Sequence, residues 1–337
     1  MKKILVIILF SGVLSTQAQI ENLFSAKGDA QIYMEHYMTP VLHGLMYGLN
    51  NSWYTTSKTH NAYGFDLSLS VSATMIPDEY RVFKFSASDY QYLNLESGSS
   101  DLPTLAGSDT NSVLSVNNEL GSISFEAPKG IGDQWPEDFV LPLAIPTPMF
   151  QAGLGLPSKT DLKLRYVPKI ANEGVSFGLF GIGAQHDLTQ YLAFMSEKPT
   201  LSISALAAYT NTQLKYVFPE NADNAGNNQR MEMGVNAYTF QVIGGINLKF
   251  IDAYLGLGYT GGNTSWSALG TYNYDFNNDG IYTTNETIVD PLDLKFNVSG
   301  FKATTGMRFN LGPVKLFADY TFQKYPAFTT GLAVSVN

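Results

Sequence analysis

Residues 63–75, YGFDLSLSVSATM, alternate between two kinds of side chain over their whole length. The odd-numbered positions are apolar or aromatic, and the even-numbered positions carry Gly, Asp, Ser or Thr. A period of two is the pattern of a β-strand with one apolar and one polar face. The stretch is also long enough to match a tilted strand that crosses a bilayer, which takes about 9–11 residues. It therefore predicts a membrane-crossing strand.

The same alternation recurs along the chain, at residues 201–209, 251–259, 301–311, 314–322 and 328–336. Residues 294–298 also alternate, but their apolar side chains have the opposite parity to those of 301–311. The change of phase at Ser299-Gly300 predicts a β-bulge, because one extra residue in a strand reverses its faces.

The composition favours a transmembrane barrel over a soluble β-sandwich. Charged residues make up only 15% of the chain and aromatic residues 13%, with 30 glycines. Aromatic side chains lie near strand ends, as at Tyr63, Tyr209, Tyr259 and Tyr320, which is typical of interfacial girdles. No apolar run past residue 18 is long enough for a spanning helix. The net charge of −9 argues against a nucleic-acid partner, which would require clustered Lys and Arg.

The first residues, MKKILVIILFSGVLSTQAQ, have the three parts of a cleaved signal peptide. A basic start precedes an apolar core, and small residues follow at the cleavage spacing, so we expect residues 1–18 to be removed. The chain has no cysteine, which excludes a lipid-modified Cys and any disulfide. We expect export to the outer membrane, outer-membrane lipid as a partner, and a monomer.

Counting strands back from the C-terminus places the long polar segments 219–231 and 264–291 outside the cell. An even strand number then requires a hairpin over 112–127 and one further strand over 51–56. The fold class is therefore all-β, an antiparallel barrel of about 14 strands. Treating 112–127 as one strand gives the alternative of 12. The barrel domain is expected over 51–337.

Residues 19–50 have helical spacing instead. Apolar side chains recur at i, i+4 and i+7, at Met34, Met38, Leu42, Leu45, Met46 and Leu49. Pro40 lies in the middle and should kink such a helix. Because its apolar face must be buried, we expect this segment to plug the barrel lumen, with a periplasmic position as the alternative.

Residues 128–150, PKGIGDQWPEDFVLPLAIPTPMF, are rich in proline, including Pro136, Pro142, Pro146 and Pro148. Proline cannot donate a hydrogen bond to a strand ladder, so the segment is predicted to be a loop folded over the barrel mouth.

A signal, a helical segment and a long barrel together resemble the long-chain fatty-acid transporter (FadL-type) superfamily. Three phrases look like an uncharacterised Bacteroidota-type branch of outer-membrane proteins: GLNNSWYTTSKTHNAYGFDLSLSVSATMIPD, PTPMFQAGLGLPSKTDLKLRYVP and GLFGIGAQHDLTQYL. The resemblance implies a lumen blocked by an N-terminal hatch. It also implies passage of a hydrophobic ligand that leaves through a strand kink into the lipid. No ligand-binding residue of that superfamily can be carried onto this sequence.

Several charged residues lie on the polar faces of predicted strands. Inward charges must pair or meet water, so we expect a polar network in the lumen that holds the plug, with an ion- or headgroup-selective path as the alternative. Its candidate members are Arg165, Lys302, Arg308, Asp252 and Asp319.

The four histidines lack the spacing of a zinc pair, and His186 has no serine beside it on its own face. We therefore expect no catalytic residue and no enzyme activity.

Residues 275–286, DFNNDGIYTTNE, fit the calcium-loop pattern D-x-[DN]-x-[DN]-G-x5-E. Asp275, Asn277 and Asp279 would supply side-chain oxygens, Ile281 its carbonyl, Thr283 a bridging water and Glu286 a bidentate carboxylate. A plain hairpin is the alternative, because Asn-Asp-Gly is a favoured turn sequence. Calcium is the only cofactor that the sequence suggests.

Together these features predict an outer-membrane barrel for the passage or binding of a small, hydrophobic compound. One alternative is a non-transporting structural or surface-binding barrel that displays its outer loops. Another is a soluble secreted β-protein.

Overall fold

The computed structural model describes residues 17–118, 121–135, 142–172, 174–195, 198–218, 226–277, 279–284 and 286–336. Residues 1–16 of the predicted signal peptide and residues 219–225 of a predicted outer loop lie outside this part. Among the described residues, no helix has the length and apolar character needed to cross a membrane.

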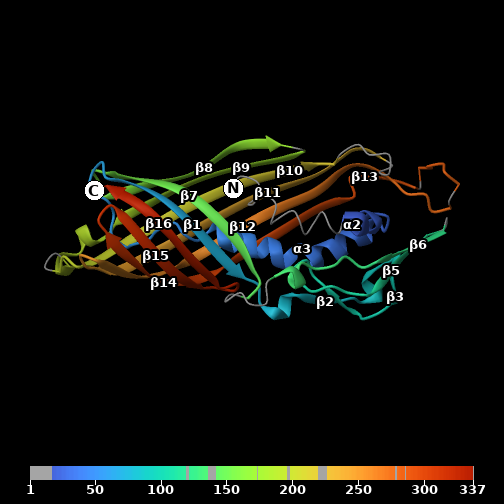
Figure 1. The fold of residues 1–337 in the computed structure, drawn as a ribbon, viewed down its shortest axis with the longest axis horizontal. Helices are drawn as coiled ribbons and strands as arrows, with labels where there is room; N and C mark the ends of the chain where they lie inside the picture. Colours follow the sequence, from blue (N-terminus) through green and yellow to red (C-terminus); the bar gives the residue numbers. More distant parts are fainter. Residues whose placement is uncertain are drawn as a thin grey trace.

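One antiparallel sheet closes on itself to form a barrel (Figure 1). Its strands are β1 (Phe65–Met75), β7 (Ala144–Leu156), β8 (Thr160–Asn172), β9 (Val175–Asp187), β10 (Leu201–Val217), β11 (Gly226–Asn247), β12 (Ile251–Asn273), β14 (Leu292–Leu311), β15 (Val314–Phe322) and β16 (Ala327–Val336). Closure follows because β1 pairs with both β7 and β16, while β11 pairs with both β10 and β12. The eleventh strand of the sheet, β13 (Thr287–Val289), pairs only with the end of β12.

The predicted antiparallel barrel is confirmed, but the described residues form a ring of ten strands, without β13, and not 14 or 12. Residues 51–56 form no strand and lie inside the lumen. The predicted hairpin over 112–127 exists as β5 (Val113–Asn118) and β6 (Gly121–Glu126). Each of these strands has only six residues, which is too short to cross a bilayer.

These two short strands belong to a separate layer at one end of the barrel. They join β3 (Leu93–Ser97) in a three-stranded sheet, beside a two-stranded sheet of β2 (Val82–Lys84) and β4 (Asp101–Pro103). The segment 76–143 that contains them covers the end of the barrel where α2 lies (Figure 1). Short single-turn helices also lie at Asp78–Tyr80, Ala87–Asp89, Gly132–Gln134, Thr189–Tyr191 and Ala193–Met195.

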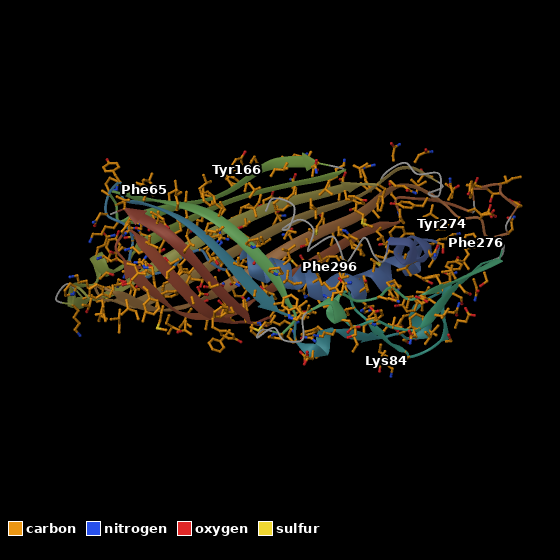
Figure 2. The ribbon with its side chains drawn as sticks, viewed as in Figure 1. Phe65, Lys84, Tyr166, Tyr274, Phe276 and Phe296 are labelled. Carbon is orange, nitrogen blue, oxygen red and sulfur yellow. The ribbon has the colours of Figure 1, made fainter. Side chains whose placement is uncertain are left out.

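The predicted bulge at Ser299-Gly300 is wrong. The register between β12 and β14 is unbroken from Ala268↔Leu292 to Ile251↔Phe309. The side chain of Phe296 is buried and lies beside α3 (Figure 2). Phe301, five residues further on, is 84% exposed. The apolar face of β14 therefore changes from the inside to the outside of the barrel without an extra residue.

On the neighbouring strands, the outward side chains also change from apolar to polar, and they do so at the same level. On β10, β11 and β12 the outward side chains are apolar up to Tyr209, Tyr238 and Tyr259, and mostly polar beyond them. Just beyond them lies a cross-strand row of four asparagines, Asn211, Asn236, Asn263 and Asn297. The amide of Asn211 donates to Asn236 at 2.9 Å, and that of Asn236 donates to Asn263 at 2.9 Å. This row indicates where the strands leave an apolar surrounding and enter water.

The helix α3 (Gly28–Leu49) occupies the interior, and α2 (Gln17–Phe24) precedes it at the covered end, in contact with β6. Figure 1 shows α3 running from the end covered by residues 76–143 toward the middle of the barrel. It packs against β14, β7, β12, β1 and β11, and its apolar face, including Met34, Met38 and Met46, is buried. Within the predicted plug segment 19–50, α3 is thus inside the lumen, and Pro40 lies within it.

Asp29 joins the plug to the outer layer. Its carboxylate accepts the backbone N–H groups of Gln91, Tyr92 and Leu93 at 2.8, 2.6 and 2.8 Å. Three such bonds to one buried anion hold the start of α3 and the segment before β3 in one position.

Candidate functional site

The chain between α3 and β1 crosses the lumen as an extended segment, residues 50–60, which we call the lumen strap. Its side chains bond to the barrel wall in several directions. Asn51 donates to Ser72 on β1 at 3.1 Å, Tyr54 donates to Gln241 on β11 at 2.9 Å, and the Ser57 hydroxyl lies 2.6 Å from that of Ser202 on β10. The wall supplies polar partners at this level, so the strap needs no strand neighbours.

Arg165 is the main attachment point of the strap. Its side chain is 0% exposed. Its three guanidinium nitrogens donate to Gln151 Oε1 at 3.0 Å, to the carbonyl of Leu49 at 3.0 Å and to that of Asn51 at 2.7 Å. The guanidinium also stacks on Trp53, 3.7 Å from the ring centroid. Arg165 thus connects β8 with the end of α3 and the beginning of the strap.

Lys302 and Arg308, on β14, hold the strap from another side. Lys302 Nζ donates to Asn51 Oδ1 at 2.7 Å and to the carbonyl of Asn50 at 3.2 Å. Arg308 forms an ion pair with Asp252, at 2.6 Å, and its other terminal nitrogen lies 3.4 Å from the Thr55 hydroxyl. Of the three cations, only Arg308 makes an ion pair with one of the predicted carboxylates.

Asp319, the last of the five predicted network residues, connects with the strap through two tyrosines. Its carboxylate accepts a hydrogen bond from Tyr254 at 3.2 Å, and the Tyr254 ring packs edge-on against Tyr54 of the strap. All five predicted network residues therefore lie on the inner face of the wall and connect with the strap, directly or through one neighbour.

Sequence reasoning missed the strap itself, and with it Trp53, Tyr54 and His60. The His60 imidazole lies 2.9 Å from Asp161, and its backbone N–H donates to the same carboxylate at 2.9 Å. The signal was present in the sequence: residues 50–60, NNSWYTTSKTH, are polar and do not alternate.

The other histidines lie apart from one another. His36 stacks on Phe83 of the outer layer, and His186 lies 2.7 Å from the Thr160 hydroxyl. His43 lies beside Tyr325 in the turn between β15 and β16. Burial, together with the Lys324 ammonium, lowers the pKa of His43 to about 4, so its imidazole is neutral near pH 7.

The barrel wall is unpaired over half of one seam. β7 pairs with β1 from Ala144 to Leu154, but with β8 only from Gln151↔Arg165 to Leu156↔Thr160. Residues 144–150 of β7 and 166–172 of β8 have no ladder between them, and Figure 1 shows the two strands running apart. We call this interruption the β7–β8 gap. Arg165 lies at its closed end.

Prolines explain why the ladder stops there. Pro146 and Pro148 lie in β7, so the prediction of a loop for all of 128–150 is wrong at its C-terminal end; residues 136–141 of that segment lie outside the described part. If the β7–β8 register continued, Pro148 would face Pro168, and neither can donate a hydrogen bond. Proline is tolerated in a strand whose edge is unpaired, and β7 has such an edge.

The predicted calcium loop, 275–286, is organised by hydrogen bonds from its own backbone. Asp275 accepts from the N–H groups of Asp279 and Gly280, and the Asp279 carboxylate accepts from Ile281. The Asn277 amide donates to Asp279 at 2.8 Å. Within the described residues, no group of three or more His, Asp or Glu side chains is placed to hold a metal. Calcium binding by this loop stays a prediction.

Glu286 has a structural role in the same loop. Its side chain is 0% exposed. Its carboxylate accepts the Thr283 hydroxyl at 2.7 Å, the Thr283 N–H at 3.0 Å and the Phe276 N–H at 3.3 Å. The buried Glu286 carboxylate therefore stabilises the hairpin through these hydrogen bonds.

We expect Glu286→Ala to lower amide protection across 274–287 by about 10- to 100-fold, because unmade bonds to a buried carboxylate cost about 1–3 kcal/mol. Hydrogen exchange with mass spectrometry measures this directly. The wild-type loop, compared in a chelator and in about 1 mM calcium, tests the metal: protection that disappears in the chelator establishes calcium ligation. Unchanged exchange in Glu286→Ala would refute the structural role.

Comparison with known proteins identifies one family. The model of the Family of unknown function (DUF6588) matches residues 1–336. No curated protein matches the chain by sequence.

Three similar solved structures are remote from this chain in sequence. Outer membrane protease OmpT from Escherichia coli shares 6% identity, covering 85% of this chain and 99% of that one, with a TM-score of 0.33. Ail, the attachment invasion locus protein of Yersinia pestis, shares 8% over 82% and 99%, with a TM-score of 0.28. The translocator domain of the autotransporter NalP from Neisseria meningitidis shares 10% over 82% and 90%, with a TM-score of 0.30. Likenesses this low carry no argument about activity.

Proposed function

The chain belongs to the Family of unknown function (DUF6588). The family supplies no activity, so we infer the function from the structure of the chain itself. We propose that it is an outer-membrane barrel that binds a small, hydrophobic compound and passes it through the side of its wall. The observation that carries the proposal is the β7–β8 gap in a barrel whose axis is occupied by α3 and the lumen strap.

The membrane placement is supported by the outer surface. The outward side chains on the strap side of the asparagine row are large and apolar, and they are exposed, as at Leu69 (52%), Phe240 (55%) and Leu257 (57%). A continuous apolar surface of this extent is unfavourable in water and is the normal exterior of a barrel in lipid. The apolar band and the predicted signal peptide together favour the outer membrane over a soluble secreted protein. The end covered by 76–143 then faces the outside of the cell.

The route through the side wall follows from how the lumen is filled. Along the axis, the strap is bonded to the wall by Arg165, Lys302 and Arg308, so straight passage would break several buried hydrogen bonds. At the gap, the wall has no ladder hydrogen bonds to break. A compound that is soluble in lipid can use a lateral opening, whereas a hydrophilic solute cannot.

The lining of the gap favours a neutral compound. The inward side chains of β7 here are Ile145, Thr147 and Met149, and Val167 is the inward residue of β8 next to Arg165. The three nitrogens of Arg165 already donate to protein acceptors. No charge at the closed end of the gap is therefore reserved for an anionic group of a ligand.

Closing the gap with a cross-link should stop passage. The chain has no cysteine, so Pro148→Cys and Pro168→Cys would be its only thiols. Cells that express this pair are treated with a bis-maleimide, and entry of the neutral fluorophore N-phenyl-1-naphthylamine across the outer membrane is followed. We expect the cross-linked protein to lose most of the entry rate that the uncross-linked pair supports.

The matched control is Leu154→Cys with Leu162→Cys, an outward pair in the part of the same seam where the ladder is intact. Cross-linking there should leave entry unchanged. Equal entry before and after cross-linking of the Pro148/Pro168 pair would refute passage through the gap, and would favour a non-transporting barrel.

A further inference from the structure

We propose that the outer face of β8–β12, immediately beyond the aromatic band, binds the phosphorylated sugar headgroup of a glycolipid in the outer leaflet. This inference rests on the proposed membrane placement of the barrel. It does not depend on passage through the β7–β8 gap, which lies along a different seam.

The position of this face follows from the level at which the outward side chains change from apolar to polar. Below the asparagine row most outward side chains are apolar, and above it most are polar or charged. Headgroups of the outer leaflet lie at the level where the strands leave the hydrocarbon. The row Asn211–Asn236–Asn263 therefore marks the lower border of a surface that faces headgroups and not acyl chains.

The face is hollowed into a groove of about 720 Å³. Polar side chains from five strands line it, among them Lys169, Ser176, Lys215, Glu232 and Ser265. Two glycines keep its floor low. A Cβ at Gly178 would come no closer than 3.6 Å to Lys169, and one at Gly234 would meet only the Ser265 hydroxyl, at 3.2 Å. A volume of this size accommodates a ligand of several rings.

The charges in the groove favour an anion. Lys215 pairs with Glu232 at 3.1 Å, but Arg230 pairs with the same carboxylate oxygen at 3.0 Å. One anion thus serves two cations. Lys169 is exposed and has no carboxylate within 4.0 Å in the described part of the chain. Among the described residues in and beside the groove, three cations, Lys169, Lys215 and Arg230, therefore accompany one carboxylate, that of Glu232, on a chain whose net charge is −9.

The remaining groups suit sugar hydroxyls and an attached acyl chain. Gln213, Ser176 and Ser265 offer amide and hydroxyl groups along the groove. On its membrane side, Tyr166 and Phe180 pair across β8 and β9 and are 58% and 45% exposed. Tyr166 points outward from the wall in Figure 2. The cations match a phosphate, the amide and hydroxyl groups match a sugar, and the apolar edge matches an acyl chain. A phosphorylated glycolipid has all three parts, whereas a soluble anion lacks the acyl chain.

The test uses the full-length protein in phosphatidylcholine nanodiscs that contain a small fraction of diphosphorylated lipid A. Native mass spectrometry measures how much lipid A remains bound. Parallel discs contain dephosphorylated lipid A or phosphatidylglycerol, which separates the sugar and the phosphate contributions. We expect retention of lipid A above both, and a loss of about tenfold or more in Lys169→Ala/Lys215→Ala, because the variant removes two donors of charge-assisted hydrogen bonds to phosphate.

A second variant tests the groove without removing charge. Gly234→Leu places a side chain in the floor and should reduce retention similarly. Its control is Gly244→Leu, an outward glycine lower on β11 with no atom within 4 Å of a Cβ, which should retain lipid A as the wild type does. Wild-type retention in both groove variants would overturn the proposal. Equal retention of phosphatidylglycerol, or displacement of lipid A by inorganic phosphate alone, would overturn the glycolipid assignment.

Discussion

Arg165→Met is expected to detach the lumen strap from the wall and to lower the free energy of unfolding by about 3–5 kcal/mol, because it leaves buried acceptors without a donor. Three acceptors lose their partner at once: the Gln151 side chain and the carbonyls of Leu49 and Asn51. Methionine restores some of the lost volume but offers no N–H group. Trp53 also loses the guanidinium stacked on its ring.

Two measurements follow this change. Urea unfolding in lipid vesicles measures the free energy of unfolding. Planar-bilayer recording measures whether the lumen conducts ions along its axis. We expect the wild type to remain closed and Arg165→Met to show transient openings, because the strap is then held only by its other bonds. Arg165→Lys keeps the charge but only one donor nitrogen, so it should fall between them.

Lys163→Met is the matched control for this prediction. Lys163 is the preceding inward residue of β8 and is also buried, at 5% exposure, but it makes no hydrogen bond to the strap among the described residues. If it destabilises the protein and opens the lumen as much as Arg165→Met does, the attachment assigned to Arg165 is wrong.

The barrel and its plug could be predicted from local patterns. Residues 65–75 alternate strictly, and this pattern alone fixes which face of β1 points outward. The helical spacing of Met34, Met38 and Leu42 likewise identified a buried helix. The inward position of Arg165 and Arg308 followed from strand parity. In each case the information lies within a few consecutive residues, where periodicity is a direct consequence of backbone geometry.

The number of strands could not be predicted in the same way. The hairpin of β5 and β6 has the local signal of strands, and only its partners show that it lies outside the ring. Residues 51–56 were counted as a strand to satisfy parity, although their partners are side chains of distant wall strands. Asn51 and Arg165, for instance, are 114 residues apart. Such long-range contacts leave no periodic pattern in a single sequence.

The remaining errors came from correct observations with the wrong physical cause. The phase change at Ser299-Gly300 is real, but it reflects a change of surroundings from lipid to water and not a bulge. The prolines at 146 and 148 do interrupt a ladder, but on one side only, since β7 still pairs with β1 there. Both features became informative once the neighbours of each strand were known.

The second large effect is expected along β14, where the outer surface changes from water-facing to lipid-facing. Outward positions 293, 295 and 297 are polar, and outward positions 303, 305 and 307 follow Phe301 in the apolar band. A cysteine in lipid does not react with a charged maleimide, because the reagent does not enter hydrocarbon. Reactivity along one strand should therefore change from complete to absent within a few residues.

The chain has no cysteine, so single-cysteine variants report one position each. Lys302→Cys, which is inward and buried, is the control for burial by protein, and all variants should react after unfolding in detergent.

Labelling of intact cells with a membrane-impermeant maleimide at these β14 positions tests the account most directly. We predict rapid labelling of Asp293→Cys, Lys295→Cys and Asn297→Cys, and no labelling of Ala303→Cys, Thr305→Cys and Met307→Cys. Equal labelling of both groups, or recovery of the protein in the soluble fraction, would contradict the outer-membrane barrel on which the proposed function rests.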